Sequence, residues 1–293
     1  MSLTSILKNR EVAERFRKEF PKIPFKLKPK KEILAPPITN RYGLVGTAFD
    51  YLLRFYLKQI NPKASERQWV AEEAATQLIS SNNKPLLKKV KNIVSEARKT
   101  YSQYLKSGRM NKKLFRSSIL LAQLDILYRS GYKDNIGNVD DRDIKDLKKL
   151  ISVMDPKLFK AKKIIVLNPT FGEGSRIVGG ADADIIIDNT LIDIKTTMNL
   201  KLRREWFHQI IGYYILSRIG GIDGVSPKHK INKLGFYFSR YGELYTITVK
   251  TLINERKLSS LIKSFRKNGE KKVVMPNAVY NEEEGEIRFM PPS

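Results

Sequence analysis

The sequence predicts an α/β fold in which a helical N-terminal elaboration precedes a β-rich core. Two observations lead to this prediction. Between about Leu44 and Tyr128, apolar residues recur at spacings of three and four, as they do on the buried face of a helix. After Asp155 the pattern changes to short apolar runs separated by turn-forming residues, which is typical of strands.

The N-terminal half is expected to begin with a charged helix that ends at Phe20. Residues 21–37 carry prolines and lysines with little periodicity, which indicates an extended basic connector. Four helices are then expected, at residues 44–60, 66–79, 85–105 and 112–128.

The core is expected to follow the order β-β-β-α-β. The predicted elements are strands at 162–167, 183–187 and 190–197, a helix at 203–219, strands at 234–240 and 244–249, and a basic helix at 251–267. The loop between the first two strands, Asn168-Pro-Thr-Phe-Gly-Glu-Gly, is rich in turn formers.

Net charge is the strongest global feature of the 293-residue chain. Its 55 lysines and arginines outnumber 30 acidic residues, which gives a formal charge of +25. Such self-repulsion favours a polyanionic partner, and nucleic acid is preferred over simple solubility. A membrane surface is disfavoured, because no helix strongly combines a basic face with a Trp/Phe/Leu face.

Cysteine is absent, which excludes disulfides, iron–sulfur clusters and cysteine-based zinc sites. No apolar run approaches the ~18 residues needed to span a bilayer. The N-terminus lacks the apolar stretch of a secretory signal, so a cytoplasmic location is expected. No phosphate-binding loop of the ATPase type is present.

Residues 84–116 form the most basic segment, with eleven basic residues and one acid, Glu96. Tyr101, Tyr104 and Phe115 are interleaved among them. A basic helix face can follow a phosphate backbone, and exposed aromatic residues can stack on bases. Aromatic residues at helical spacing are also common in cores, and the sequence leaves that choice open.

The chemistry is predicted on a hairpin between residues 179 and 197. Asp188-Asn189 suits a two-residue type I′ turn, because both residue types tolerate positive φ. With that turn, Asp184 lies opposite Asp193, and the two-residue period of a strand places Lys195 on the same face. A turn at Asn189-Thr190 would shift this register, and Asp182 is an alternative to Asp184.

Two carboxylates and one ammonium thus converge within apolar strands. Buried like charges are costly without a cation, which indicates a Mg²⁺ or Mn²⁺ site. Such an ion binds a phosphate oxygen and activates water, while Lys195 orients or deprotonates that water or stabilises the transition state. The alternative is a salt-bridged hairpin that faces solvent. The isoleucines on both faces of these strands make that alternative less attractive.

The chain also resembles the RecB-like branch of the PD-(D/E)xK nuclease superfamily. The resemblance covers roughly residues 44–249 and rests on four motifs in the family order. They are Gly46-Thr-Ala-Phe-Asp50, with Asp where the family has His; Gly180-Ala-Asp-Ala-Asp184; Asp193-Ile-Lys195-Thr196; and Gln209-Ile-Ile-Gly-Tyr213.

The resemblance implies a restriction-endonuclease-like core, in which a mixed sheet is flanked by helices. It implies a metal held by Asp50, Asp184, Asp193 and the carbonyl of Ile194. It further implies that Lys195 serves catalysis and that Gln209 and Tyr213 position Lys195 or the substrate. Residues 1–40 would then form a basic helix and connector, and residues 41–293 a single nuclease domain. The expected parts of that domain are a helical part (41–155), a catalytic core (156–250) and a basic helix and tail (251–293).

Other candidates carry weaker signals. Glu173 is an outside candidate for a further metal ligand, His208 is expected at the surface or an interface, and Glu72 and Glu73 are expected to be solvated. Trp69 and Trp206 are expected in the core or at its edge, and His229 has no assigned role.

The expected function is metal-dependent hydrolysis of DNA. An RNA-directed nuclease and a catalytically silent nucleic-acid-binding or assembly module remain alternatives. Endonucleolytic and exonucleolytic cutting are not distinguished by the sequence.

Overall fold

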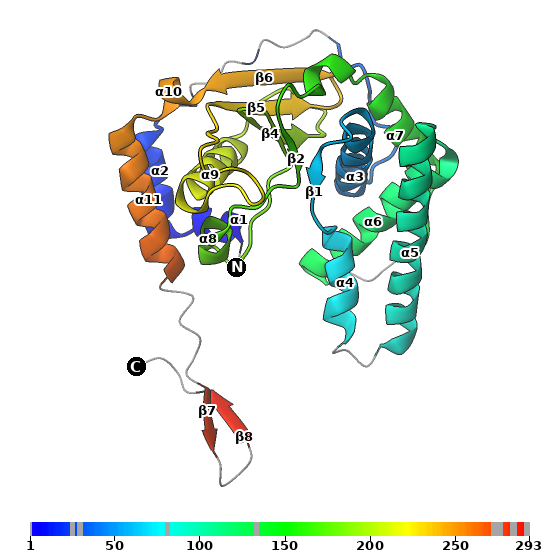
Figure 1. Ribbon diagram of the computed structural model, residues 1–293, viewed down its shortest axis with the longest axis horizontal. Coiled ribbons are helices and arrows are strands. Elements are labelled where there is room, and N and C mark those ends of the chain that lie inside the picture. The colour runs from blue at the N-terminus through cyan, green and yellow to red at the C-terminus, as the bar shows by residue number, and fades with distance from the viewer. Residues whose placement is uncertain are drawn as a thin grey trace.

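A six-stranded mixed sheet lies at the centre of the protein in the computed structural model (Figure 1). The structure describes residues 2–23, 27, 32–79, 83–131, 135–270, 278–281 and 286–289. The strands are β1 (Ser65–Glu66), β2 (Ile165–Leu167), β3 (Ile185–Ile187), β4 (Thr190–Lys195), β5 (Lys233–Phe238) and β6 (Glu243–Thr248). They follow the chain order across the sheet. The β1–β2 and β4–β5 pairs are parallel, and the others are antiparallel.

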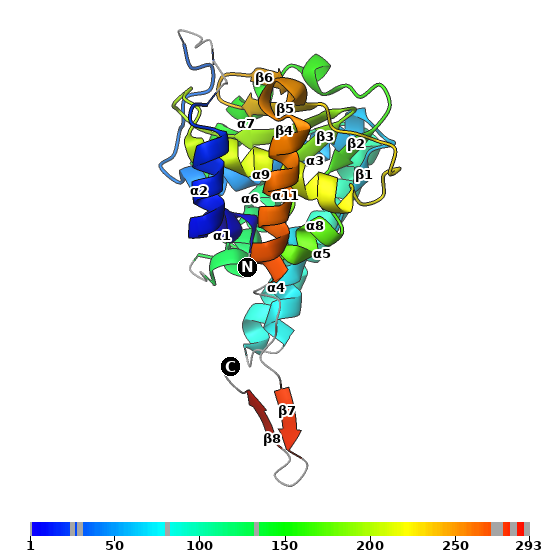
Figure 2. The ribbon, with the colours of Figure 1, turned by 90° about the vertical axis from the view of Figure 1, so that its left-hand side faces the viewer.

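Helices cover both faces of this sheet, so the prediction of an α/β fold with a mixed sheet flanked by helices is confirmed. One face packs against α3 (Tyr42–Ile60), α4 (Val70–Ile79), α5 (Lys84–Ser107), α6 (Lys112–Ser130) and α7 (Asp141–Ser152). The other packs against α1 (Leu3–Leu7), α2 (Arg10–Glu19), α8 (Glu173–Ile177), α9 (Arg204–Gly220), α10 (Val249–Leu252) and α11 (Glu255–Glu270). Figure 2 shows α2 and α11 side by side on this second layer.

Alternation along the strands divides the apolar residues between two cores. Ile185, Ile187 and Ile192 are buried in the core that contains α3 and α6. Ile186 and Leu191 are buried in the core that contains α9. Successive strand residues point to opposite faces, so both faces of the hairpin are covered, as its isoleucines predict.

Several predicted boundaries are wrong. The first helix is two helices, because Asn9 starts α2 by accepting hydrogen bonds from the backbone N–H groups of Glu11 and Val12. The helix expected from Glu66 begins at Val70, since Ser65 and Glu66 pair with β2 at the sheet edge. The basic helix expected from residue 251 is divided into α10 and α11.

Some elements lie outside the sequence prediction. They are α7, capped by Asp140; α8, in the turn-rich loop; a 3-10 turn at Pro156–Phe159; β1; and the hairpin of β7 (Ala278–Asn281) with β8 (Glu286–Phe289). Parts of the expected connector at 21–37 and of the expected tail lie outside the described residues. Among the described residues, no helix has both the length and the apolar character that crossing a membrane requires.

A buried ion pair joins three distant segments. Arg240, after β5, is 1% exposed and donates from Nη1 to Asp146 Oδ1 of α7 at 2.9 Å. Its Nη1 also donates to the carbonyl of Ala35 at 2.9 Å, and the N–H of Ile38 donates to Asp146 Oδ2 at 3.1 Å. The pair therefore holds residues 35–38 and α7 against the end of the sheet.

Removing one partner of this pair should destabilise the protein strongly. We expect Arg240→Met to lower the free energy of unfolding by about 3–5 kcal/mol, because the Asp146 carboxylate would stay buried without its cation. Urea denaturation at neutral pH measures the change.

Arg142→Met is the matched control, because Arg142 pairs with Asp140 on the exposed side of the same helix. Its cost should be small, because an exposed ion pair contributes little to stability. Equal costs for the two variants would contradict the role assigned to the buried pair.

Candidate active site

The hairpin has the predicted register. Ile187 pairs with Thr190, Ile186 with Leu191, and Ile185 with Ile192. Asp184, just before β3, and Asp193, in β4, occupy the next opposed positions. The alternative register with a turn at Asn189-Thr190 is therefore wrong.

The turn itself differs from the type I′ expectation, because only Asp188 of the two turn residues has positive φ, at 47°. Its carboxylate accepts hydrogen bonds from the backbone N–H groups of Lys162, Lys163 and Ile164. Burial raises the pKa of Asp188, but these hydrogen bonds outweigh it and leave the pKa below its usual range. Asp188 thus ties the turn to the segment that leads into β2.

Asp193 and Lys195 form a buried ion pair on the α9 face of β4. The Lys195 Nζ lies 2.6 Å from Asp193 Oδ2, and Asp193 is 3% exposed. The two-residue period of the strand places them on one face, as predicted. A salt-bridged hairpin that faces solvent is not what the structure contains.

Lys195 is linked to both motif residues of α9. Its Nζ donates to Gln209 Oε1 at 3.4 Å, and Gln209 Nε2 donates to Tyr213 Oη at 3.1 Å. Gln209 and Tyr213 lie one helical turn apart and share a face. Trp206, which the sequence left in the core or at its edge, lies with its ring centroid 5.3 Å from Nζ.

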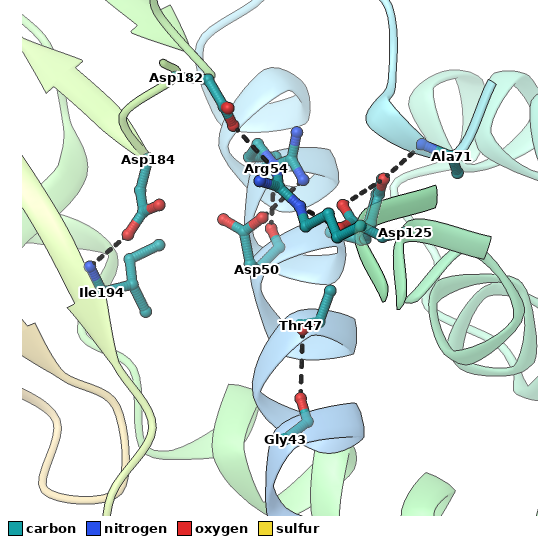
Figure 3. Close-up of polar contacts among 11 residues, drawn as sticks. Gly43, Thr47, Asp50, Arg54, Ala71, Asp125, Asp182, Asp184 and Ile194 are labelled. Carbon is teal, nitrogen blue, oxygen red and sulfur yellow. Dashed lines mark hydrogen bonds and ion pairs between the residues drawn. The ribbon is translucent and has the colours of Figure 1, made fainter. Parts of the chain in front are cut away.

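Asp50 and Asp184 face one another across a cavity of about 400 Å³ (Figure 3). Asp184 Oδ2 accepts a hydrogen bond from the Ile194 N–H at 2.6 Å. Ile194, Gln209 and Tyr213 also line the cavity, whereas Asp193 and Lys195 adjoin it through Gln209. Residues from both helical layers therefore meet here.

The predicted metal ligands do not form one group. No three acidic or histidine side chains come together as a metal site within the described residues. Each carboxylate is paired instead, since Arg54 Nη2 lies 2.6 Å from Asp50 Oδ2, Ile194 binds Asp184, and Lys195 binds Asp193.

The donor set nevertheless suits a hard divalent cation. Burial raises the pKa of Asp184 well above its usual range, and the carboxylates of Asp193 and Asp50 raise it further. Burial also raises the pKa of Asp50 and of Asp193, although Arg54 and Lys195 respectively oppose the change. Asp50 Oδ1 is buried without a hydrogen-bond partner. Oxygen donors of this kind, short of positive charge, are those that Mg²⁺ and Mn²⁺ prefer.

Four charged residues of the cavity wall were outside the predicted site or only at its margin. They are Arg54 on α3, Asp125 and Arg129 on α6, and Asp182 before β3. Arg129 pairs with Asp125 at 2.5 Å and with Asp182 at 3.4 Å. Asp182 thus lines the cavity together with Asp184. The pattern Asp-x-x-x-Arg occurs on both helices and is the sequence signal that pairs Asp50 with Arg54 and Asp125 with Arg129.

The remaining candidates lie elsewhere. Glu173 pairs with Arg266 at 3.2 Å and does not line this cavity. His208 packs against Phe16 of α2, where burial, aided by the charge of Arg204, lowers its pKa to about 4. His229 Nε2 lies 2.8 Å from the carbonyl of Asp188.

Burial decides the role of the aromatic residues in the basic segment 84–116, which spans α5 and the start of α6. Tyr101, Tyr104 and Phe115 are buried, so they belong to the core and do not offer exposed faces for base stacking. Trp69 is buried beside Tyr101. The expectation that Glu72 is solvated is wrong, because its side chain is only 15% exposed. Arg98 donates two hydrogen bonds to it, at 2.7 and 2.9 Å. The lysines of α5 remain exposed.

Comparison of the chain with protein-family models, with curated proteins and with solved structures finds no match. The site geometry is thus the basis for assigning a function.

Neutralising Asp184 should stabilise the protein in the absence of divalent metal. Because its folded-state pKa is raised, this carboxyl contributes stability below its unfolded pKa near 3.8, and that contribution is lost as pH rises through the folded pKa. We expect Asp184→Asn to raise the free energy of unfolding at neutral pH by on the order of 1 kcal/mol or more, with the gain fading toward pH 4. Urea denaturation in EDTA across that pH range measures it.

Asp188→Asn is a control of opposite sign. Its folded pKa is lowered, so its contribution is present above the unfolded pKa and is lost as pH falls through the folded pKa. This variant should destabilise the protein at neutral pH. A loss of stability in Asp184→Asn at neutral pH in EDTA would contradict the inference that the buried, charged Asp184 carboxylate destabilises the metal-free protein.

Proposed function

We propose that the protein is a metal-dependent nuclease that hydrolyses the phosphodiester backbone of DNA, on a restriction-endonuclease-like core of the RecB-like branch. The observation that carries the proposal is the setting of Lys195. It is paired with Asp193, hydrogen-bonded to Gln209, and placed beside a cavity that contains Asp184 and Asp50. These five positions come from all four motifs of the resemblance, except that Asp50 replaces the family's His.

Asp184 and Asp50 would hold Mg²⁺ or Mn²⁺, with Asp193 and the carbonyl of Ile194 as the further ligands that the resemblance implies. When bound, such an ion lowers the pKa of water and neutralises charge on the phosphoryl group. The raised pKa values of Asp50 and Asp184 and the unpartnered Asp50 Oδ1 support this assignment.

Lys195 is suited to orient the attacking water and to stabilise charge on the phosphate in the transition state. The bond that forms joins the water oxygen to phosphorus, and the bond that breaks joins phosphorus to the leaving oxygen. The water gives up one proton to solvent, and the leaving oxygen takes one up to become a hydroxyl. Asp193 and Gln209 hold the Lys195 ammonium in place, and Tyr213 holds Gln209. Positioning of this kind matters because small displacements of a catalytic group are costly.

The net charge of +25 supports a polyanionic substrate, and the exposed lysines of α5 add to the field that would attract it. RNA shares the same backbone chemistry. Matched DNA and RNA substrates at one salt concentration separate the two, and preferential cleavage of RNA would replace DNA in the proposal.

A second candidate function is a catalytically silent nucleic-acid-binding or assembly module. Two observations favour it: Arg54 occupies one oxygen of Asp50, and the described residues hold no three-ligand group. Under that reading Arg54, Lys195 and the backbone N–H of Ile194 are the partners of Asp50, Asp193 and Asp184, and no metal binds.

Cleavage of end-labelled and circular DNA with Mg²⁺ or Mn²⁺ tests the proposal. We expect cleavage by the native chain, none in EDTA, and a loss of at least about 100-fold in Lys195→Ala, because it removes a donor directed at developing charge. Lys233→Ala, which removes an exposed lysine from the neighbouring strand β5, is the matched control and should keep native activity.

The outcomes separate the two modes of cutting and the two candidate functions. Attack on circles shows endonucleolytic cutting, whereas cleavage confined to linear ends shows exonucleolytic cutting. If the native chain binds DNA but does not cut it with either metal, the silent module replaces the nuclease.

A further inference from the structure

Two helices bring the same pattern to one cavity. Asp50 and Arg54 lie four residues apart on α3, and Asp125 and Arg129 lie four residues apart on α6. Side chains at this spacing share a helix face. In both pairs the aspartate holds the arginine, and all four residues line the cavity of the candidate active site (Figure 3 labels three of them).

The two arginines differ in what they leave accessible. Arg54 is buried, and its Nη2 is engaged by Asp50. The Arg129 side chain is 52% exposed. Arg129 is therefore the member of the pattern that can reach a ligand without a rearrangement of the core.

Arg129 is held from behind by a buried anchor. Its Nε donates to Asp125 Oδ1 at 2.5 Å. Asp125 is itself positioned by the hydroxyl of Tyr51, which donates to Oδ2 at 3.2 Å and accepts from the N–H of Ala71 at 3.0 Å. This chain of contacts fixes the direction of the guanidinium.

The contact in front of Arg129 is weaker. Its Nη2 lies 3.4 Å from Asp182 Oδ2, on the opposite wall. A short bond to a buried partner and a long bond to a partly exposed one are what a guanidinium needs if it is to keep the first and exchange the second. Burial tends to lower the pKa of Arg129, but the charges of Asp125 and Asp182 outweigh this effect and keep the guanidinium protonated.

Arg129 also lies where the carboxylate cavity meets a second, larger groove. A groove of about 1020 Å³ adjoins the cavity, and the two share Val70, Arg129, Asn168 and Asp182. Its volume lies at or above the ~300–1,000 Å³ of small-molecule pockets, which suits a segment of a polymer. The residues of the groove come from α4 and α6 on one side and from α8 and the loop before β3 on the other.

We propose that Arg129, positioned by Asp125, binds a backbone phosphate of the nucleic acid where the strand passes from the groove into the carboxylate cavity. This inference rests on the proposed function for the class of ligand. A phosphodiester is an anion with two free oxygens, and the planar fork of arginine matches it better than any other side chain. The phosphate takes the place of Asp182, while Asp125 is retained.

Among the described residues, three other arginines line these walls. Arg54 is committed to Asp50, and Arg67, in the groove, lies 2.9 Å from Asp223 Oδ2, which the Thr170 hydroxyl and the Gly172 N–H also bind. Arg176 lines the groove but not the carboxylate cavity, so Arg129 is the exposed arginine of this set that borders both. The competing explanation for Arg129 is a salt bridge that only joins α6 to the loop before β3.

Binding of a labelled single-stranded DNA oligonucleotide in EDTA tests the inference without requiring cleavage. We expect Arg129→Gln to weaken binding about tenfold, the scale of a charge-assisted hydrogen bond, and to reduce the slope of log Kd against log salt concentration by about one contact. Arg142→Gln is the matched control. It removes the same charge from an Asp–Arg pair that lines neither cavity, and it should change binding little.

A phosphate scan identifies the contact itself. Oligonucleotides that each carry one neutral methylphosphonate linkage should show one linkage at which the native chain loses affinity and Arg129→Gln does not. Asp125→Asn, which tests the positioning residue, should reduce the penalty at that same linkage only. A purely structural role would lower thermal stability and weaken all linkages alike.

Arg129→Lys keeps the inference testable if the glutamine variant does not fold. It retains the charge but not the fork, so it should bind more weakly than the native chain and still discriminate the same linkage. If Arg129→Gln matches Arg142→Gln at every linkage while native DNA cleavage is intact, Arg129 does not bind substrate and the inference falls alone. If the linkage effect appears but no metal supports cleavage, the inference stands and the proposed nuclease function falls.

Discussion

The pairing register of β3 with β4 is the constraint on which the candidate site depends. A strand has a period of two, so a slip of one residue would exchange the two faces of the hairpin. Isoleucines would then replace Asp193 and Lys195 on the face of α9, and the charges would enter the core beside α3. The apolar residues of both faces oppose that slip, because Ile185 and Ile192 fill one core while Ile186 and Leu191 fill the other. The carboxylate of Asp188 adds to this specification by binding three consecutive N–H groups ahead of β2.

Buried charge is the second organising feature, and it is handled in two ways. At Arg240 and Asp146 the hydrogen bonds are extended to backbone groups, and the pair serves to hold segments together. At the candidate site the carboxylates outnumber the cations, and the pKa values of Asp50, Asp184 and Asp193 are raised. A fold selected for stability alone would have little reason to keep three such groups in one region, which is the expectation for a site in which charge has a function.

Much of this arrangement was accessible from sequence, for identifiable reasons. The hairpin was predictable because its turn residues and its alternating isoleucines specify the same register. The link from Lys195 to Gln209 and Tyr213 followed from the motif order. The Asp-x-x-x-Arg spacing on α3 and α6 pairs Asp50 with Arg54 and Asp125 with Arg129, but it does not show that both pairs meet at one cavity. That meeting depends on how α3 and α6 pack, and helix packing leaves no short-range signature. β1 could not be foreseen for a related reason, since it is two residues long and exists only through its pairing with β2. The omission of α7 is different, because its Asp140 cap and its apolar residues Ile144, Leu147 and Leu150 are a local signal for a helix.

The site also draws its parts from two layers that have separate cores. Asp50 belongs to the layer of α3, and Gln209 and Tyr213 belong to the layer of α9, on the other face of the sheet. These layers are joined through the sheet and through few direct contacts at the cavity, so the spacing of Asp50 from Asp184 and the spacing of Lys195 from Gln209 are set by different packing surfaces. Substitutions can therefore affect the pair Asp50 and Asp184 separately from the pair Lys195 and Gln209. A substitution deep in one core can alter the spacing of Asp50 from Asp184 while Lys195 and its partners keep their geometry. Under the proposed function, the metal preference of the protein could change in this way without loss of Lys195.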